Sequence, residues 1–395
     1  MPKITPDPHG CLQLPPDFLN RRRLDPSAEY WLDERDGDLI LHPRRPDARK
    51  IFIEVTTACN LKCQTCIRHS WADPSTHMRR ETFENILSGI AAFPALDQVV
   101  LTSFGEPLMH PHLLEMIAAL RERKLAVTLG TNGTMLTENV ARELVRLGVS
   151  QVVVSIDGIE PETYAGVRGT LLSEVTANIE RLNEIRQQAG AAAPSLGIEF
   201  VAMKQNQKEL EGLAELATRL GVTRTVVSNL LPYTAEMNDQ KLYGYGPIPP
   251  LKTIGYPVRT NAWVRWGVTE LPRMHWGAEP RCRFVHDNAI VVSWDGGVSP
   301  CYALSHSYDY IAVDGVQKHV SRYILGNVNE TPLAEIWMSE EYTCYRSEVR
   351  AFHFPSCPDC DLRETCDLRA KNEACWGPNP SCADCLWAQD IVKCA

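Results

Sequence analysis

Three closely spaced cysteines constrain this chain more than any other feature of its sequence. Cys59, Cys63 and Cys66 have the spacing C-x3-C-x2-C and follow an apolar run at residues 51–55 that predicts a buried strand. So short a loop can direct three thiolates at one inorganic cluster, and the next cysteine along the chain is Cys282. A [4Fe–4S] cluster held by three thiolates keeps one iron free of protein ligands, where a small molecule can bind.

Zinc is the alternative metal for this motif. Structural zinc sites normally close four ligands as two C-x2-C pairs, and this motif contains one such pair. His69 follows the third cysteine closely enough to act as a fourth ligand. The spacing therefore favours an iron–sulfur cluster and leaves zinc open.

The motif resembles the signature of the radical S-adenosylmethionine (SAM) enzymes. The resemblance implies that SAM chelates the open iron, and that an electron from the reduced cluster cleaves SAM to a 5′-deoxyadenosyl radical. It also implies oxygen sensitivity and an electron donor such as ferredoxin or flavodoxin. Many members have an aromatic residue before the third cysteine, where this chain has Thr65, a departure that concerns packing around the cluster rather than ligation.

Composition limits the class of protein. A length of 395 residues allows two domains, or one large domain with an appendage. The net charge of −9 argues against non-specific nucleic-acid binding. The polar, proline-broken start is unlike a secretory signal, and no apolar run approaches the roughly 18 residues of a membrane span. We therefore expect a cytoplasmic protein without a membrane partner, whose fourteen cysteines are metal ligands rather than disulfides.

Strand-like and helix-like patterns alternate between residues 51 and 228, which predicts an α/β fold with a parallel sheet. Strands are expected at residues 51–56, 97–102, 125–130, 151–156, 197–203 and 223–228, and helices at 83–92, 113–123, 140–147, 174–188 and 208–220. Such sheets carry their chemistry at the carboxyl ends of the strands. Periodicity alone does not separate a barrel from a doubly wound sheet, but the family resemblance implies a partial (β/α)6 barrel.

The uneven distribution of cysteines marks the domains, since ten of the fourteen lie between Cys282 and Cys394. We expect an N-terminal extension at 1–50 with a hairpin around Asp36-Gly37, a barrel at 51–230, a bridging region at 231–281 and a cysteine-rich domain at 282–395. The bridging region contains Trp263, Trp266 and Trp276. These favour a bridge whose aromatics fill gaps between domains, with a substrate-covering insertion as the alternative.

The segment after the second predicted strand, residues 103–107, resembles the Gly-Gly-Glu-Pro segment of the family, with Phe104 in place of the first glycine. Gly105 would let the backbone approach a ligand closely, and the resemblance implies that Glu106 receives the ammonium of SAM. An ordinary β-α turn also accommodates Gly-Glu-Pro. The position one β-α unit after the cysteine loop favours the binding role.

Three further strand ends offer SAM contacts. Asn132 lies in the turn after the third predicted strand, and Ser155 and Asp157 alternate on the fourth, so they share a face. They are candidates for the ribose and the methionine moiety. Residues 164–169 resemble a family segment whose arginine meets the SAM carboxylate, which implies Arg168. A capping aspartate and a surface arginine are the alternatives.

The cysteines of the tail resemble the SPASM domain, a two-cluster extension of peptide- and cofactor-modifying radical SAM enzymes. The resemblance implies two auxiliary [4Fe–4S] clusters, although eight residues separate Cys366 from Cys375 where the family has three. We expect the first cluster to bind Cys282, Cys301 and Cys375, and the second to bind Cys357, Cys360, Cys366 and Cys394.

Three tail cysteines fall outside that family pattern. Cys382 and Cys385 are each candidates to close the first cluster, and Cys344 is expected to be a packed thiol in a helix. A zinc ribbon that pairs Cys357 and Cys360 with Cys382 and Cys385 is the competing interpretation.

The end of the chain, residues 375–394, and the segment 67–71 resemble one SPASM branch, the maturases encoded with tungsten-cofactor oxidoreductases. The resemblance implies modification of a cofactor, or of the protein that carries it, for a tungsten–pterin oxidoreductase. Two alternatives remain open. One is the crosslinking or epimerisation of a ribosomal precursor peptide, and the other is a non-catalytic iron–sulfur carrier.

Overall fold

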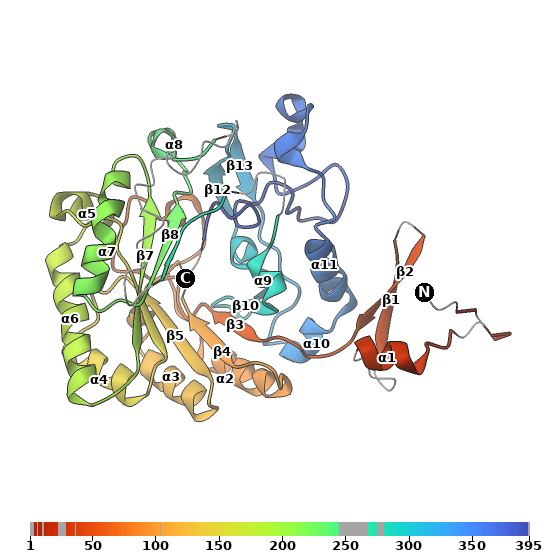
Figure 1. Ribbon diagram of the computed structural model, residues 1–395, viewed down its shortest axis with the longest axis horizontal. Helices are drawn as coiled ribbons and strands as arrows, with labels where there is room; N and C mark the ends of the chain where they lie inside the picture. The colour runs from red at the N-terminus through yellow and green to blue at the C-terminus, as the bar shows by residue number, and fades with distance from the viewer. Residues whose placement is uncertain are drawn as a thin grey trace.

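A parallel sheet organises the chain, with helices on one side and the cysteine-rich tail on the other (Figure 1). This computed structural model describes residues 4–5, 7–9, 12–22, 29–35, 37–102, 104–244, 268–274 and 280–393. The six central strands are β3 (Lys50–Ile53), β4 (Gln98–Leu101), β5 (Ala126–Thr131), β6 (Gln151–Ser155), β7 (Ser195–Ala202) and β8 (Arg224–Asn229). They coincide with the six predicted strands to within a few residues.

The order of these strands distinguishes the barrel from a doubly wound sheet. From β3 to β8 every strand pairs in parallel with its neighbour in sequence. A doubly wound sheet would reverse its order at a switch point, and no reversal occurs among these strands. The strand order therefore confirms the predicted partial (β/α)6 barrel.

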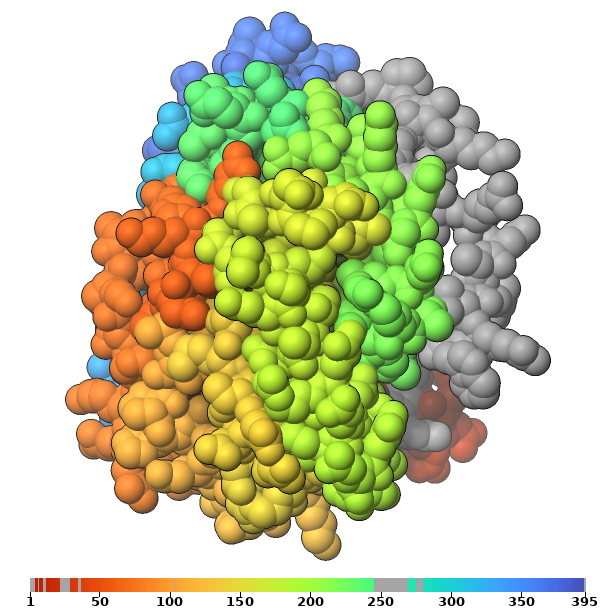
Figure 2. All heavy atoms as spheres, turned by 90° about the vertical axis from the view of Figure 1, so that its left-hand side faces the viewer, coloured from red at the N-terminus to blue at the C-terminus, as the bar shows by residue number. Residues whose placement is uncertain are grey.

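Helices cover the outer face of this sheet in chain order, as the run of colours from orange to green in Figure 2 shows. They are α2 (Arg80–Gly89), α3 (Leu113–Glu122), α4 (Glu138–Arg146), α5 (Pro161–Arg168), α6 (Leu172–Gln188) and α7 (Leu210–Arg219). Thr137 caps α4 by accepting a hydrogen bond from the N–H of Val140. The short helix α5 was not predicted, because eight residues give little periodicity.

The core lies between the sheet and these helices. Alternate residues of each strand are fully buried, for example Ile51 and Ile53 on β3, Leu129 on β5, and Ile198 and Phe200 on β7. Branched and aromatic side chains suit this crowded, pleated surface. The core therefore fixes the strand register, and with it the positions of the loops that follow the strands.

The sheet extends beyond the six predicted strands at both edges. On one side β10 (Ala289–Val292) pairs in parallel with β3, and β11 (Val298–Ser299) pairs antiparallel with β10. On the other side β9 (Val268–Glu270) pairs in parallel with β8. The first strands of the tail thus continue the barrel sheet instead of forming a sheet of their own.

The rest of the tail is built from short elements stacked beside the barrel. These are α9 (Arg283–His286), the hairpin of β12 (Tyr308–Ile311) and β13 (Gln317–Val320), α10 (Leu333–Trp337) and α11 (Glu340–Ala351). Short 3-10 helices complete the described chain: η1 (Ile67–Ser70), η2 (Ile90–Ala92), η3 (Pro107–Met109), η4 (Gln207–Glu209), η5 (Tyr302–Leu304), η6 (Cys357–Asp359), η7 (Arg363–Thr365) and η8 (Asp367–Ala370). Such short elements suit a region in which ligands to metal clusters follow one another closely.

The N-terminal extension contains α1 (Pro16–Arg22) and the predicted hairpin, formed by β1 (Tyr30–Arg35) and β2 (Asp38–Pro43). The indole of Trp31 donates a hydrogen bond to the carbonyl of Met338, so the hairpin contacts the tail (Figure 1). In the bridging region the structure describes α8 (Ala235–Gln240), whereas Trp263, Trp266, Trp276 and Cys394 lie outside the described residues. None of the described helices is long and apolar enough to cross a membrane.

Candidate active site

The cysteine loop begins where β3 ends and leads into η1. Burial raises the pKa of Cys63 to about 11; nearby Arg168 opposes this, and the Cys66 and Cys59 thiols add to it. Burial likewise raises the pKa of Cys66, and the Cys59 thiol again contributes. The loop therefore brings the three predicted cysteines into one electrostatically coupled group.

The spacing of this group fits a cluster better than a single ion. One zinc ion needs its ligand atoms to converge closely. In the described part of the chain, one set of three His, Cys, Asp or Glu side chains has all its ligand atoms within 4.8 Å of one another, namely Asp33, His42 and Cys344. The motif cysteines and His69 form no such set, and a cluster would hold the thiolates farther apart than a single ion does.

Gly105 packs against the backbone that leads into the cysteine loop. A Cβ on Gly105 would lie 2.3 Å from the carbonyl oxygen of Thr56 and 2.8 Å from that of Ala58. The N–H of Glu106 donates to the same Ala58 carbonyl at 2.8 Å. The close approach at Gly105 is therefore to the backbone that leads into the cysteines, whereas the sequence predicted an approach to a ligand.

Glu106 is a buried carboxylate held by three donors. Its Oε1 accepts hydrogen bonds from the N–H of Leu108 (3.0 Å) and the hydroxyl of Thr131 (2.8 Å). Its Oε2 accepts from the N–H of Asn132 at 2.7 Å. Burial raises the pKa of Glu106 despite these bonds, and about one of the four acceptor positions of a carboxylate remains. A cation at that position would stabilise the charge, which is the role predicted for the ammonium of SAM.

Asn132 joins the cysteine loop to the end of β5. Its amide donates to Oδ1 of Asn60 at 2.9 Å and lies 3.9 Å from the sulfur of Cys59. Its own Oδ1 accepts from the N–H and the hydroxyl of Thr134. Asn132 therefore orients the first thiol of the motif, a contact that was not predicted for it.

Asp157 and Arg168 form a buried ion pair, with 3.0 Å between Oδ2 and Nη1. The second oxygen of Asp157 accepts from the N–H of Val201 at 2.9 Å. Burial by itself would lower the pKa of Arg168, but the charge of Asp157, the Cys63 and Tyr164 groups and the hydrogen bond to Asp157 together raise the pKa above its ordinary value. Nε of Arg168 is buried without a hydrogen bond within the described residues. Arg168 is thus neither a surface residue nor fully satisfied.

These groups border a cavity of about 190 Å³ at the carboxyl ends of the strands. Of the predicted residues, Cys66, Ser155, Asp157 and Arg168 line it, whereas Gly105, Glu106 and Asn132 are not among its lining residues. Further lining residues that were not predicted are Thr65, Ile67, Thr102, Phe104, Glu199, Val201, Ser228, Asn229, Leu231, Tyr302, Trp387, Val392 and Lys393. Thr102, Glu199, Ser228 and Asn229 lie at or near the ends of predicted strands, so the sequence did contain a signal for them.

The last described residues of the tail close one side of this cavity. The amide of Asn229 donates to the carbonyl of Ile391 at 3.0 Å, and the N–H of Lys393 donates to the hydroxyl of Ser228 at 3.0 Å. The ammonium of Lys393 pairs with Asp390 at 2.7 Å. These bonds fix the chain end to β8, which places Trp387, Val392 and Lys393 in the cavity wall.

A buried histidine ties the tail to the cysteine loop. Nε2 of His306 lies 2.9 Å from Glu54, which follows β3, and Nδ1 pairs with Asp73. Burial alone would lower the pKa of His306, but hydrogen bonds to these two carboxylates and their charges raise it. Two rings from the barrel contact the His306 ring: Trp71 is tilted against it, and Phe104 meets it edge to face.

The tail cysteines form two groups. Cys301 interacts electrostatically with Cys282, Cys385 and Cys382, and three of these four line a cavity of about 40 Å³. Cys357 interacts with Cys375 and Cys366, and these three line a second cavity of about 60 Å³ together with Cys360. Each group offers four thiols around a space, which fits two clusters.

This grouping corrects two expectations. Cys375 lies with the second group, not with Cys282 and Cys301 as predicted, because the longer spacing after Cys366 lets the chain return to the same cavity. Both Cys382 and Cys385 join the first group. The zinc-ribbon pairing would draw its cysteines from both groups. Cys344 lies near Asp33 and His42, away from the two groups.

Comparison with known proteins identifies the family. Residues 53–217 match the radical SAM superfamily, and residues 282–361 match the iron–sulfur cluster-binding domain called SPASM. A curated protein of Pyrococcus furiosus, the "tungsten-containing aldehyde ferredoxin oxidoreductase cofactor-modifying protein", is 38% identical over 87% of this chain and 96% of its own length.

Two solved structures share the fold. Streptococcus suis SuiB bound to precursor peptide SuiA has a TM-score of 0.58 and 16% identity, with 82% of this chain and 71% of that chain covered. Native anSMEcpe with bound AdoMet has a TM-score of 0.53 and 17% identity, with 87% and 96% covered. The chain belongs to the radical SAM enzymes with a C-terminal SPASM domain, in the branch of the tungsten-oxidoreductase cofactor-modifying protein.

Proposed function

We propose that this enzyme uses SAM-derived radical chemistry to modify the cofactor of a tungsten-containing oxidoreductase, or the protein that carries that cofactor. The observation that carries the proposal is the 38% identity to the Pyrococcus furiosus cofactor-modifying protein, which extends over nearly the whole of that relative. A maturase of this kind acts on a client oxidoreductase, which is therefore the proposed partner.

In this proposal Cys59, Cys63 and Cys66 hold the [4Fe–4S] cluster that binds SAM. The cluster, when bound, supplies the electron that cleaves SAM reductively. Arg168, held in place by Asp157, directs its free Nε toward the SAM carboxylate. The remaining acceptor position of Glu106 takes the SAM ammonium.

The remaining predicted residues have supporting roles. Ser155 lines the cavity where the ribose would lie. Asn132 holds the cysteine loop through its bond to Asn60. Gly105 leaves room for that loop, because any side chain there would collide with its backbone.

The tail is proposed to hold two auxiliary [4Fe–4S] clusters. Cys282, Cys301, Cys382 and Cys385 would bind the first, and Cys357, Cys360, Cys366 and Cys375 the second, which leaves Cys394 without a required role. Lys318 forms an ion pair with Asp384, and Asp384 lines both cysteine cavities. Ferredoxin or flavodoxin is the proposed electron donor, in the reducing cytoplasm that so many free thiols require.

A second candidate function is modification of a precursor peptide. The shared fold with SuiB, solved with its precursor peptide SuiA, motivates it. At 16% identity this likeness extends to the fold alone, so cofactor modification is preferred. A precursor-peptide gene beside this one would favour the peptide, and a tungsten oxidoreductase gene would favour the cofactor.

The first test asks whether the chain is a catalyst or an iron–sulfur carrier. The anaerobically reconstituted protein is incubated with SAM and dithionite, and 5′-deoxyadenosine is measured by liquid chromatography. We expect steady production by the wild type and by Cys344→Ala, and none after alanine replacement of Cys59, Cys63 or Cys66, with the tail iron retained. A carrier would produce none in any variant.

The second test addresses the substrate. The reduced enzyme and SAM are incubated with the cofactor released from a tungsten oxidoreductase, with the intact oxidoreductase, or with a candidate precursor peptide. A mass change in the cofactor or the carrier protein that depends on Cys63 supports the proposal. A mass change confined to the peptide would replace it with the second function.

A further inference from the structure

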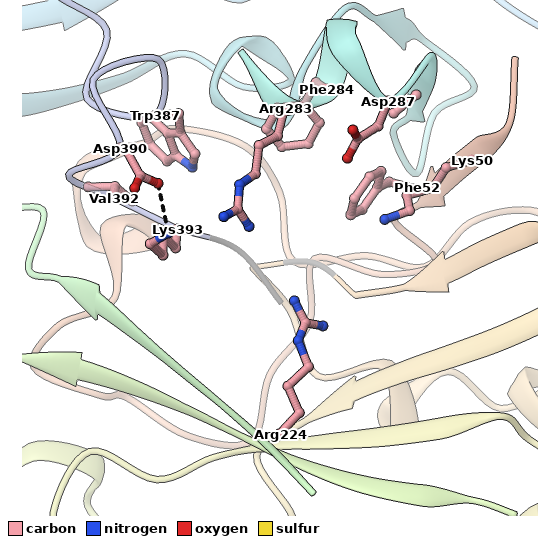
Figure 3. A pocket seen from close by; sticks show the side chains of 11 residues that line it. Lys50, Phe52, Arg224, Arg283, Phe284, Asp287, Trp387, Asp390, Val392 and Lys393 are labelled. Carbon is pink, nitrogen blue, oxygen red and sulfur yellow. Dashed lines mark ion pairs between the residues drawn. The ribbon is translucent and has the colours of Figure 1, made fainter. Parts of the chain in front are cut away.

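A second cavity, of about 150 Å³, is shown in Figure 3, and it shares lining residues with the cavity of about 190 Å³ at the carboxyl ends of the strands, hereafter the radical cavity. The cavity is lined by the first residues of three strands, Lys50 of β3, Arg224 of β8 and Ala289 of β10. Trp387, Val392 and Lys393 line both cavities. The chain end is therefore a shared wall between the two spaces.

Basic side chains from four separate parts of the chain border this second cavity. Figure 3 shows the guanidinium groups of Arg224 and Arg283 directed toward the space between them, with Lys50 and Lys393 at its sides. The lining also includes two acids, Asp287 and Asp390. Basic side chains this close in space repel one another unless carboxylates neutralise them. The carboxylates nearby therefore decide whether the cavity can bind an anion.

The carboxylates within the described residues do not balance these cations. Arg224 and Arg283 share a single carboxylate, that of Glu270, with distances of 3.0 and 3.2 Å. Each guanidinium has five N–H donors, so most of the donors of both lack a carboxylate partner among the described residues. Lys393 is paired with Asp390.

Lys50 makes no ion pair with any described residue. Its ammonium lies 5.7 Å from the centroid of the Phe52 ring, and burial lowers its pKa although Asp287 opposes the shift. A partly buried ammonium without a paired carboxylate gains more from a bound anion than an exposed one does. Asp287 in the lining and Asp97 outside it also act on Lys50. The side chains that line the cavity are nevertheless four basic and two acidic ones, so the lining itself carries an excess of positive charge.

We propose that this second cavity is a binding site for the oxyanion of a small-molecule ligand, either a phosphate or a carboxylate group. Guanidinium groups bind both kinds of oxyanion through paired N–H donors, and Lys50 adds a point charge. The shared wall formed by Trp387, Val392 and Lys393 sets this anion beside the radical cavity. That the ligand is the enzyme's substrate rests on the proposed function, whereas anion binding itself does not.

The test uses the anaerobically reconstituted enzyme without SAM or reductant. Inorganic phosphate and acetate are titrated separately by isothermal calorimetry, and the stronger of the two identifies the oxyanion class. We expect Lys50→Met to weaken binding about tenfold, the change that loss of one charge-assisted hydrogen bond typically causes. Lys50→Arg keeps the charge and should bind within a few-fold of the wild type. Lys208→Met, at an exposed lysine of η4, is the matched control and should leave the affinity unchanged.

A footprinting experiment on the wild type avoids any effect of substitution on folding. Acetylation of individual lysines is followed by mass spectrometry with and without the anion that binds more strongly. We expect the anion to slow acetylation of Lys50 and not of Lys208. Absence of binding by both anions, equal affinity in Lys50→Met and Lys208→Met, or unprotected Lys50 would overturn the proposal. Production of 5′-deoxyadenosine is measured separately, so failure of this site and failure of the radical function are distinguished.

Discussion

Arg168, at the end of α5, reaches back to Asp157, which follows β6, and the two form a buried ion pair of 3.0 Å in the wall of the radical cavity. Because the other oxygen of Asp157 is bonded to the N–H of Val201, the pair is fixed to two neighbouring strands. The backbone carbonyl of Arg168 also lies 3.8 Å from the sulfur of Cys63. One ion pair therefore holds a predicted SAM-binding group and touches the cluster loop.

We predict that Asp157→Asn lowers both stability and SAM affinity. The substitution leaves a buried guanidinium without its counter-charge, which typically costs about 3–5 kcal/mol. SAM affinity should fall about tenfold or more, because Arg168, which lines the cavity, is no longer fixed by its ion pair. Anaerobic denaturant unfolding measures the first effect and equilibrium dialysis with SAM the second.

The control for this substitution is Glu138→Gln, which breaks the exposed ion pair with Arg142, both residues being 56% exposed. Such surface pairs contribute about 0–1 kcal/mol, so stability and SAM affinity should be nearly unchanged. Equal effects of the two substitutions would contradict a special role for the Asp157–Arg168 pair.

Gly105→Ala should displace the cysteine loop. The new methyl group would lie 2.3 Å from the carbonyl of Thr56, and backbone cannot yield as a flexible side chain does. Overpacking of this kind typically costs about 1–3 kcal/mol. We expect loss of the iron of the first cluster, measured by iron analysis and by electron paramagnetic resonance of the reduced protein, with the tail iron retained.

Gly166→Ala is the matched control, since a Cβ at Gly166 in α5 has no atom within 4 Å. Alanine in an exposed helix position should be neutral or stabilise by up to about 1 kcal/mol. Normal iron content in Gly105→Ala would mean that the loop accommodates the methyl group and that this glycine is not required.

Cysteine substitutions test the two groups of the tail. Cys375→Ala should remove iron from the cluster of Cys357, Cys360 and Cys366, a loss of up to about four irons per chain. Cys344→Ala should remove none, because Cys344 lies in neither group. Mössbauer spectra identify which cluster is lost, and loss of the cluster of Cys282 in the Cys375 variant would restore the original sequence-based pairing.

His306 should make stability depend on pH. Its pKa is raised in the folded protein, so the stabilisation by protonated His306 is fully present below the unfolded value of about 6.5. It is lost as the pH rises through the folded pKa. We expect the unfolding temperature of the wild type to fall between pH 6 and pH 9 more than that of His306→Gln. Parallel pH profiles of the two proteins would exclude this histidine as the source.

The sequence by itself determined the local features. The six alternating strand and helix patterns are local in sequence, and they predicted the α/β fold. The spacing of Cys59, Cys63 and Cys66 is also local, and it carried the resemblance to a family that implied SAM and the barrel. The candidates Ser155, Asp157 and Arg168 were found because side-chain alternation on a strand and a short family segment are also local. All three line the radical cavity as expected.

Only the tertiary structure decided which distant segments meet. The grouping of Cys375 with Cys357, the placement of Lys393 in the radical cavity and the ion pairs of His306 join residues from different parts of the fold. Hydrophobic periodicity records which face of an element is buried, not what covers it. The shape of the assembled core and the pairing of buried polar groups fix which distant segments lie side by side. For this reason the grouping of the tail cysteines and the second cavity emerged only from the fold.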